Sequence, residues 1–363
     1  MKQRLLSIDI FRGITIAFMI IVNSPGSWEY VYAPLRHASW DGCTPTDLVF
    51  PFFIFAVGLS MAFSMRNLER KSTAEWTQKI LKRTFLIFLV GFLLNWFPFY
   101  HKNILDVRVF GVLQRIALSY GMAALLILFI QKEKYLLISI ILGLMGYTII
   151  MKLGGDFTLE NNFGKKLDSM LLPDKNLYGG FGTPFDPEGL LGSIPSAMHV
   201  IIGFLFGKYL IDNKSNPQNF LKSIFIFGVV LIGFGYFVLA KSAPINKPLW
   251  TPAYVMYTSG LACILLGILV YLLDVQKIQK WSFPFNVFGR NALFSYVMSI
   301  VLVKVLIYLV KFEDGNGYSK LYSTVFQPLL GNHPGSLAFA LSIVMVVFVG
   351  SYILYKKNIM IKL

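Results

Sequence analysis

Long runs of apolar residues, separated by shorter polar segments, dominate this sequence. A helix that crosses a bilayer needs about 20 predominantly apolar residues. The runs of that length predict an all-α integral membrane protein with about ten transmembrane helices, near residues 8–24, 46–65, 81–97, 109–130, 134–152, 189–211, 220–240, 251–273, 286–310 and 335–355. We expect residues 1–363 to form a single polytopic transmembrane domain.

Two of the polar segments are long, at about residues 25–45 and 153–188, and the second is rich in Gly, Pro, Asn and Asp. Loops of more than about 12–15 residues are usually functional or disordered. The N-terminus imitates a secretory signal, with Lys2 and Arg4 before an apolar run, but Asp9 and Arg12 interrupt that run. No small-residue cleavage site follows, so we expect a retained helix.

Composition supports the membrane assignment. Hydrophobic residues make up 56% of the chain and charged residues only 14%, against roughly 45–50% and about 25% in soluble domains. Nucleic-acid binding, a secreted disulfide scaffold and intrinsic disorder are excluded by this balance. The two cysteines, Cys43 and Cys263, lie far apart and form no metal or redox motif.

The net charge of +15 is unevenly distributed along the chain. With the N-terminus in the cytoplasm, eighteen of the 33 Lys and Arg residues fall on the inner side and eleven on the outer side. Positive charge accumulates in cytoplasmic loops. The sequence therefore predicts cytoplasmic N- and C-termini and a multi-pass protein of the cell inner membrane, with the lipid bilayer as its surroundings.

All four histidines fall in outer loops or in the outer halves of spans, and His37 has the most reactive neighbours. Histidine is the side chain whose ordinary pKa suits proton transfer near neutrality. Thr46 or Asp47 could cap the following helix, whereas capping alone does not require a histidine. Asn23 closes the preceding span and could supply an amide near His37 if the loop folds back. For the other three histidines, a polar residue held in place by its surroundings is the simpler interpretation.

Charged residues inside the spans are a second signal, because each costs on the order of 2.5–3.5 kcal/mol at mid-bilayer. One interpretation is local: Asp9 and Arg12 share a helix face and form an ion pair. The other is functional: Arg12, Gln114 with Arg115, and Arg290 with Asn291 converge on an anionic ligand. The residues alone favour neither interpretation. Lys304, also within a span, could snorkel or pair.

Several blocks of sequence resemble one known family, in the same order along almost the whole chain. They are residues 4–13 (RLLSIDIFRG), 37–42 (HASWDG), 46–51 (TDLVFP), 111–116 (GVLQRI), 186–191 (DPEGLL), 245–250 (INKPLW) and 288–293 (FGRNAL). They are similar to the bacterial branch of the heparan-alpha-glucosaminide N-acetyltransferase family.

This resemblance implies a transmembrane acetyltransferase that uses acetyl-CoA from the cytoplasm as co-substrate and acetylates a glucosamine-type amine on the far side. The family's catalytic histidine falls on His37 and its partnering asparagine on Asn23. Asp9 and Asp47 are expected to support the site. By position, the residues expected to bind CoA are Arg12, Gln114, Arg115, Arg290 and Asn291.

The residue chemistry is compatible with this reaction. Acetyl transfer to an amine needs a group that takes the amine proton and a donor that stabilises the oxyanion. His37 is either that base or a nucleophile that carries the acetyl group, and Asn23 offers an amide donor. We expect no metal, and an amino sugar or glycan as acceptor, while a homodimer is one assembly that the sequence leaves open. The rival function is an amino-sugar transporter.

Overall fold

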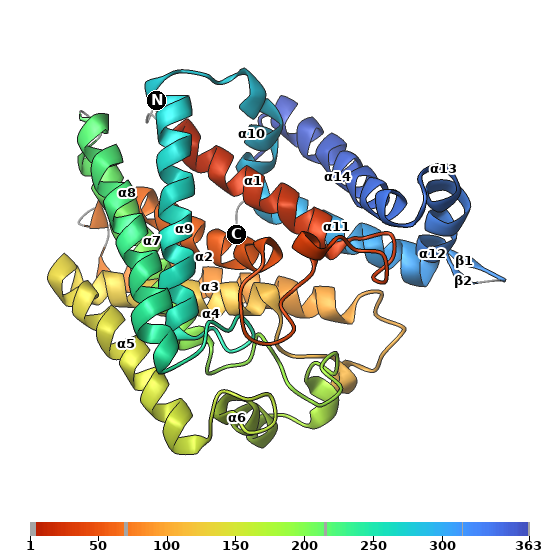
Figure 1. Ribbon diagram of the computed structural model, residues 1–363, viewed down its shortest axis with the longest axis horizontal. Coiled ribbons are helices and arrows are strands. Elements are labelled where there is room, and N and C mark those ends of the chain that lie inside the picture. Colours follow the sequence, from red (N-terminus) through yellow and green to blue (C-terminus); the bar gives the residue numbers. More distant parts are fainter. Residues whose placement is uncertain (1–4, 69–71, 214–215, 314, 362–363) are drawn as a thin grey trace.

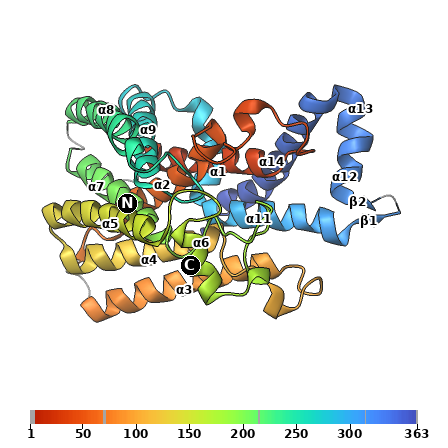
Figure 2. The same cartoon turned by 60° about the horizontal axis from the view of Figure 1, so that its bottom comes forward.

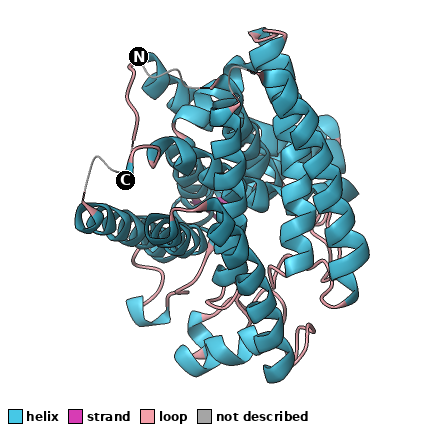
Figure 3. Ribbon diagram, turned by 90° about the vertical axis from the view of Figure 1, so that its left-hand side faces the viewer, coloured by secondary structure: helices cyan, strands magenta, loops and turns pink. Residues whose placement is uncertain are grey.

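The computed structural model describes residues 5–68, 72–213, 216–313 and 315–361, so Lys2 and Arg4 lie outside the described residues. Apart from the two short strands β1 (Lys311–Phe312) and β2 (Gly315–Asn316), its regular elements are helical (Figure 3). The all-α prediction is confirmed. The α-helices are α1 (Leu6–Asn23), α2 (Val49–Ser64), α3 (Thr73–Trp96), α4 (Val112–Ile130), α5 (Glu133–Gly154), α6 (Phe163–Leu171), α7 (Ser193–Asp212), α8 (Pro217–Gly233), α9 (Pro252–Leu269), α10 (Phe283–Arg290), α11 (Ala292–Lys304), α12 (Gly317–Leu321), α13 (Gln327–Leu330) and α14 (Asn332–Lys356).

Nine helical stretches in the described part of the chain are long and apolar enough to cross a membrane. They correspond to nine of the ten predicted spans. The remaining predicted span, 81–97, is helical as part of α3, but α3 is not among the nine. The first half of α3 carries Lys79, Lys82 and Arg83. The apolar stretch that follows these residues is therefore shorter than the about 20 residues that a membrane-spanning helix needs.

Two predicted segments differ in detail from the structure. The predicted span 286–310 is broken at Asn291, which separates α10 from α11, and α11 continues as a π-helical turn over Val305–Leu309. The predicted loop 153–188 contains the helix α6, which is amphipathic and too short for hydropathy alone to reveal. Side-chain capping begins this helix, because Asn162 accepts a hydrogen bond from the backbone N–H of Lys165.

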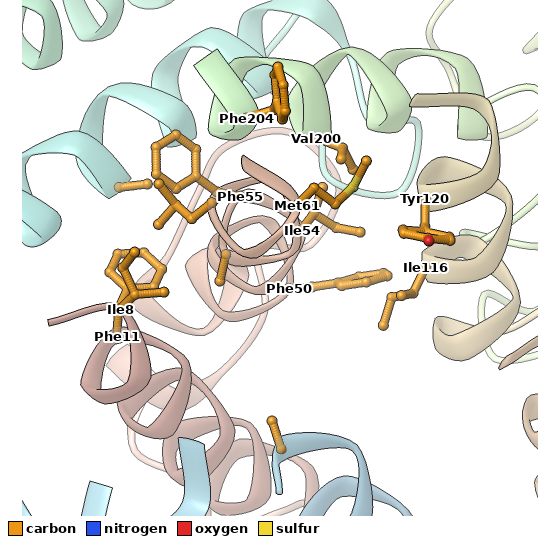
Figure 4. Close-up of a cluster of buried hydrophobic side chains, with 14 of the residues drawn as sticks. Ile8, Phe11, Phe50, Ile54, Phe55, Met61, Ile116, Tyr120, Val200 and Phe204 are labelled. Carbon is orange, nitrogen blue, oxygen red and sulfur yellow. The ribbon is translucent and has the colours of Figure 1, made fainter. Parts of the chain in front are cut away.

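Helix α2 lies at the centre of the bundle and packs most closely against α7, with α1, α4 and α9 around it (Figure 1). Apolar side chains of α1, α2, α4 and α7 meet in this core, among them Phe11, Phe55 and Phe204 (Figure 4). The backbones of α2 and α7 approach closely at two glycines. A Cβ added at Gly58 would lie 2.1 Å from a backbone oxygen of α7, and one added at Gly203 would lie 2.3 Å from a backbone oxygen of α2. Small residues permit such close packing in membranes.

The other helices surround this core in pairs, with α3 beside α4 and α8 beside α9 (Figure 2). The core helices and the surrounding helices differ strongly in burial. In the most apolar part of α1, 67% of the residues are buried, whereas in the most apolar part of the stretch Pro217–Lys241, which contains α8, only 17% are buried. An apolar helix that hides so little of its surface within the protein faces lipid. This distribution of buried and exposed apolar helices agrees with the prediction of a multi-pass membrane protein.

The long loop between α1 and α2 positions the candidate base. It contains two 3-10 turns, Ala33–Leu35 and Pro45–Leu48, and the second leads directly into α2. Trp40 of this loop contacts Phe181 and Phe185 of the segment between α5 and α7. The two predicted outer loops therefore pack against each other, and α6 belongs to the second of them (Figure 1).

Candidate active site

His37 and Asp47 form a close pair at the start of α2. His37 Nδ1 lies 2.6 Å from Asp47 Oδ1. The other oxygen of the carboxylate, Oδ2, accepts hydrogen bonds from the backbone N–H groups of Ala38 at 3.0 Å and Thr44 at 3.1 Å. Asp47 thus completes a capping box with Thr44 on the turn Pro45–Leu48, whereas the sequence predicted a cap on the following helix, and its carboxylate also holds the histidine.

The surroundings of Asp47 determine where the histidine carries its proton. The aspartate side chain is only 2% exposed, and its Oδ2 is used by two N–H donors. An ionised carboxylate can only accept, so the 2.6 Å contact assigns the donated hydrogen to His37 Nδ1. Nε2 of the neutral ring then carries a lone pair. The histidine side chain as a whole is 46% exposed.

Lys247, on the segment between α8 and α9, completes the pair from a distant part of the chain. Its Nζ lies 3.3 Å from Asp47 Oδ1 and 3.1 Å from His37 Nδ1. Burial lowers the pKa of Lys247, and the charge of Asp47 opposes that shift. Tyr254 adds a further link by donating its hydroxyl to the backbone carbonyl of Asp47 at 2.6 Å.

Sequence reasoning gave Lys247 and Tyr254 no role. The block at residues 245–250 was noticed only as part of the resemblance, and nothing in its local pattern connects it with a histidine more than 200 positions earlier. The same segment ties down the loop that carries His37. Asn246 Nδ2 donates to the Trp40 carbonyl at 3.1 Å and to Asp41 Oδ1 at 3.0 Å. The N–H of Gly42 donates to the Ile245 carbonyl at 2.7 Å.

Arg115 lies fully buried on the same side of the molecule as this loop. One guanidinium nitrogen donates to the Gly189 carbonyl at 2.8 Å, and the guanidinium lies 5.4 Å from the ring centroid of Trp250. Its Nε and Nη1 have no hydrogen-bond partner among the described residues. The neighbouring Gln114 donates to the Val109 carbonyl at 2.9 Å.

Arg12 and Arg290 lie elsewhere, where α10 packs against the N-terminal half of α1. Arg12 donates to Ser60 Oγ at 3.3 Å and to the carbonyl of Gly289. It also pairs with Asp9 at 3.9 Å, which confirms the predicted ion pair. The guanidinium of Arg290 stacks 4.7 Å from the ring centroid of Tyr355. Arg12 and Arg290 thus contact a different set of residues from those that Arg115 contacts.

Asn291 holds the C-terminal tail in place. Its Nδ2 donates to the Ile359 carbonyl at 2.9 Å, and its Oδ1 accepts from the N–H of Ile361 at the same distance. Both ends of this amide are therefore used within the chain. The sequence placed Asn291 with the cofactor-binding residues, and the structure shows a structural task for its side chain.

Asn23 ends α1 and its side chain is exposed. In the described structure no hydrogen bond joins it to His37. The remaining histidines have other surroundings: His101 stacks on Tyr308, His333 contacts two tyrosines, and His199 is fully buried beside Phe55 and Trp250. Of the four, His37 is the one that combines a carboxylate partner with an exposed ring.

Lys304 lies within a predicted span, and the sequence left open whether it snorkels or pairs; in the structure it pairs with backbone carbonyl groups. Its Nζ donates to the carbonyls of Leu94, Asn95 and Phe97 at 2.5–3.2 Å. These carbonyls belong to the C-terminal end of α3, where the helix dipole is negative. Lys304 therefore joins α11 to α3.

An ion-pair cluster anchors the segment between α6 and α7. Arg108 donates to both oxygens of Asp186 at 2.8 and 2.6 Å, and to Glu188 at 2.5 Å. Burial would lower the pKa of Arg108, but these two carboxylates raise it well above its ordinary value. Near His37, burial raises the pKa of Cys43 to about 12, so this thiol is protonated at neutral pH. It does not compete with His37 as a base.

Comparison with known proteins agrees with the resemblance seen in the sequence. A family model described as "Heparan-alpha-glucosaminide N-acetyltransferase, catalytic" matches residues 4–235. The heparan-alpha-glucosaminide N-acetyltransferase of Homo sapiens is 29% identical over 88% of this chain, and that of Mus musculus is 28% identical over 99%. The chain spans 56% and 61% of the length of these two relatives. The matched model covers more than half of the chain, which therefore belongs to the heparan-alpha-glucosaminide N-acetyltransferase family.

Proposed function

We propose that this protein is a membrane-embedded N-acetyltransferase that moves the acetyl group of acetyl-CoA to the amine of a glucosamine-type sugar. The observation that carries the proposal is the contact of 2.6 Å between His37 Nδ1 and the buried carboxylate of Asp47. Because Nδ1 donates in that contact, Nε2 of His37 carries the lone pair that can accept a proton. The names of the two relatives support the choice of reaction.

In the proposed reaction, Nε2 of His37 removes a proton from the sugar amine. The amine nitrogen forms a bond to the thioester carbonyl carbon, the bond from that carbon to sulfur breaks, and the CoA sulfur leaves and takes up a proton. Asp47 holds the imidazole in the required tautomer and orientation, and Lys247 forms an ion pair with the same carboxylate. An alternative with the same residues is a two-step route in which Nε2 first accepts the acetyl group.

The phosphate groups of acetyl-CoA need cationic partners, and we assign Arg12 and Arg290 to them. Arg290 is the better supported, because it forms no ion pair with a carboxylate in the described structure and stacks on Tyr355. Both residues lie near the N-terminal half of α1, whereas His37 follows its C-terminal end. In the proposed orientation the phosphates are bound from the cytoplasmic side and the acetyl group is transferred on the opposite side.

The experiment uses purified protein in liposomes supplied with acetyl-CoA and glucosamine. We expect release of free CoA together with N-acetylglucosamine, and loss of both in His37→Ala. His101→Ala is the matched control, because His101 stacks on Tyr308 away from the pair, and it should retain activity. Full turnover by His37→Ala would remove His37 from the mechanism.

The same liposomes separate the transferase from the amino-sugar transporter. A transferase consumes acetyl-CoA in proportion to the sugar that is acetylated. Accumulation of unmodified glucosamine inside liposomes without acetyl-CoA would instead support transport and contradict the proposal.

A further inference from the structure

A cavity of about 450 Å³ opens beside the segment that carries His37. Three parts of the chain line it: residues 39–41 after α1, residues 157–160 and Phe181 between α5 and α7, and Pro244 before α9. The volume is within the range of small-molecule sites, about 300–1,000 Å³. Three of its lining residues, Ser39, Trp40 and Asp41, belong to the block 37–42 that resembles the family, but the sequence alone did not indicate a cavity there.

The walls of the cavity are held rigidly. Trp40 Nε1 donates to the Phe157 carbonyl at 2.9 Å, which joins the first wall to the second. The Trp40 ring meets Phe181 edge to face, with the ring centroids 5.8 Å apart. Asn246 joins the first wall to the third through its bonds to Trp40 and Asp41. A site held in this way loses little entropy when a ligand binds.

The cavity combines aromatic surface with negative charge. Trp40, Phe157 and Phe181 offer apolar rings, while Asp41 and Glu160 place carboxylates at the exposed rim. Asn246 occupies only Oδ1 of Asp41, so its Oδ2 has no hydrogen-bond partner among the described residues. A sugar ring has one face of C–H groups that pack on aromatic rings. A protonated amine is attracted both to the carboxylates and to the π-faces of the aromatic rings.

The cavity is also close to the proposed base. Ser39 lines it and follows His37 by two residues, so their Cα atoms are at most about 7.6 Å apart. The N–H of Ala38, between them, is fixed by Asp47. Lys247, which contacts His37, follows Pro244 and Asn246 along the chain. The segments that form the cavity are thus the ones that position the catalytic pair.

We propose that this cavity binds the amino-sugar acceptor, with the sugar ring against Trp40 and Phe181 and its ammonium group near Asp41 and Glu160. The assignment rests on the proposed function, because it names the site of the acceptor in that reaction. The carboxylates bind the protonated amine on arrival. His37, which precedes the lining residue Ser39 by two positions, then removes a proton from the ammonium group before transfer.

The test compares Asp41→Asn and Glu160→Gln with Glu313→Gln. Glu313 is an exposed acidic residue beside the short β-hairpin and does not line the cavity, so it is the matched control. We expect each cavity variant to raise the KM for glucosamine about three- to ten-fold, since each loses a charge that attracts the ammonium group at the exposed rim of the cavity. The kcat and the KM for acetyl-CoA should remain as in the unmodified protein.

Binding of glucosamine without acetyl-CoA, followed by saturation-transfer NMR, tests the site independently of catalysis. Glucose, which lacks the ammonium group, should bind more weakly than glucosamine to the unmodified protein, and the difference should shrink in both cavity variants. Ser39→Trp, which places a bulky group in the cavity, should weaken the binding of both sugars.

The two proposals fail in different ways. If the unmodified protein binds glucosamine and the cavity variants bind it more weakly, the acceptor site stands even if no acetyl group is transferred. If the unmodified protein acetylates glucosamine but the cavity variants and Ser39→Trp leave its KM and its binding unchanged, the cavity is not the acceptor site, although the proposed function stands. Absence of glucosamine binding to the unmodified protein would also overturn the assignment.

Discussion

The backbone between His37 and Asp47 turns back on itself, and this turn brings the two side chains together. Two backbone N–H groups fix the Asp47 carboxylate, and the carboxylate in turn fixes the histidine ring. A group held in this way is oriented before substrate arrives, which removes a cost from the chemical step. We therefore propose Asp47 as a positioning residue whose effect should appear in kcat.

Asp47→Asn tests this role. The amide keeps the size of the carboxylate but loses its charge, so it no longer stabilises the imidazolium that forms during the reaction. We expect kcat to fall by roughly 100-fold or more, while the KM for acetyl-CoA changes little. Asp41→Asn is the matched control, and its effect should appear in the KM for glucosamine instead. An unchanged kcat in Asp47→Asn would contradict the positioning role.

Asp168 of α6 gives a prediction of pH dependence. It is buried with 1% exposure, and burial raises its pKa to about 7 although the N–H of Leu190 donates to it. An aspartate in the unfolded chain has its ordinary pKa near 4. The folded protein binds this proton more tightly, so its contribution to stability is complete below about pH 4 and declines as the pH rises through about 7.

The matching experiment is a thermal melt of Asp168→Asn at several pH values. The amide resembles the protonated acid, so we expect the variant to melt at a higher temperature than the unmodified protein at pH 8 and to show a smaller change between pH 5 and pH 8. Asp174→Asn removes an exposed charge from the same region and serves as control. A pH dependence equal to that of the unmodified protein would show that Asp168 is ionised in the fold.

At the scale of elements, the contact between α2 and α7 sets the frame of the site, because α2 follows directly after Asp47. Gly203→Ala would place a methyl group 2.3 Å from the Phe55 carbonyl oxygen. Overpacking of this kind costs about 1–3 kcal/mol. We expect a lower melting temperature, measured on protein purified in detergent.

Gly146→Ala on α5 is the matched control, because a Cβ there meets nothing within 4 Å. It should leave the melting temperature unchanged or raise it slightly, since alanine favours the helix more than glycine does. Equal melting temperatures for the two variants would mean that α2 and α7 can move apart to accommodate the added methyl group at little cost in stability, which would contradict the prediction.

The helices could be predicted from sequence far better than the site. Apolar runs of about 20 residues have few alternatives to a spanning helix, so nine of the predicted spans were found. The break at Asn291 was missed because hydropathy does not report a local change of helix direction. His37 was identified from its reactive neighbours, whereas its contact with Lys247 depends on how helices far apart in the sequence pack.

At the scale of the whole molecule, the orientation in the membrane remains a prediction. The distribution of Lys and Arg places both termini in the cytoplasm and the loop that carries His37 outside. Ser39 and Lys357 are both exposed, so cysteines placed there report on the two sides. The background should carry Cys43→Ser and Cys263→Ala, which removes the native thiols.

In intact cells, a membrane-impermeant maleimide should label Ser39→Cys, and it should label Lys357→Cys only after permeabilisation. The cysteine-free background, which should remain unlabelled, is the control. The reverse pattern would place the catalytic pair on the cytoplasmic side and would remove the need to carry the acetyl group across the membrane.

The three walls of the cavity differ in how closely they are bound to the catalytic pair. Residues 39–41 and Pro244 belong to segments that also hold His37, Asp47 or Lys247, whereas no hydrogen bond or ion pair in the described structure joins residues 157–160 or Phe181 to these three. Changes in the second wall that keep the backbone carbonyl bound by Trp40 should therefore affect the acceptor more than the proposed base. Exchange of residues 156–184 between members of the family is consequently a route to engineered acetyltransferases with new acceptors, and it gives natural selection the same freedom.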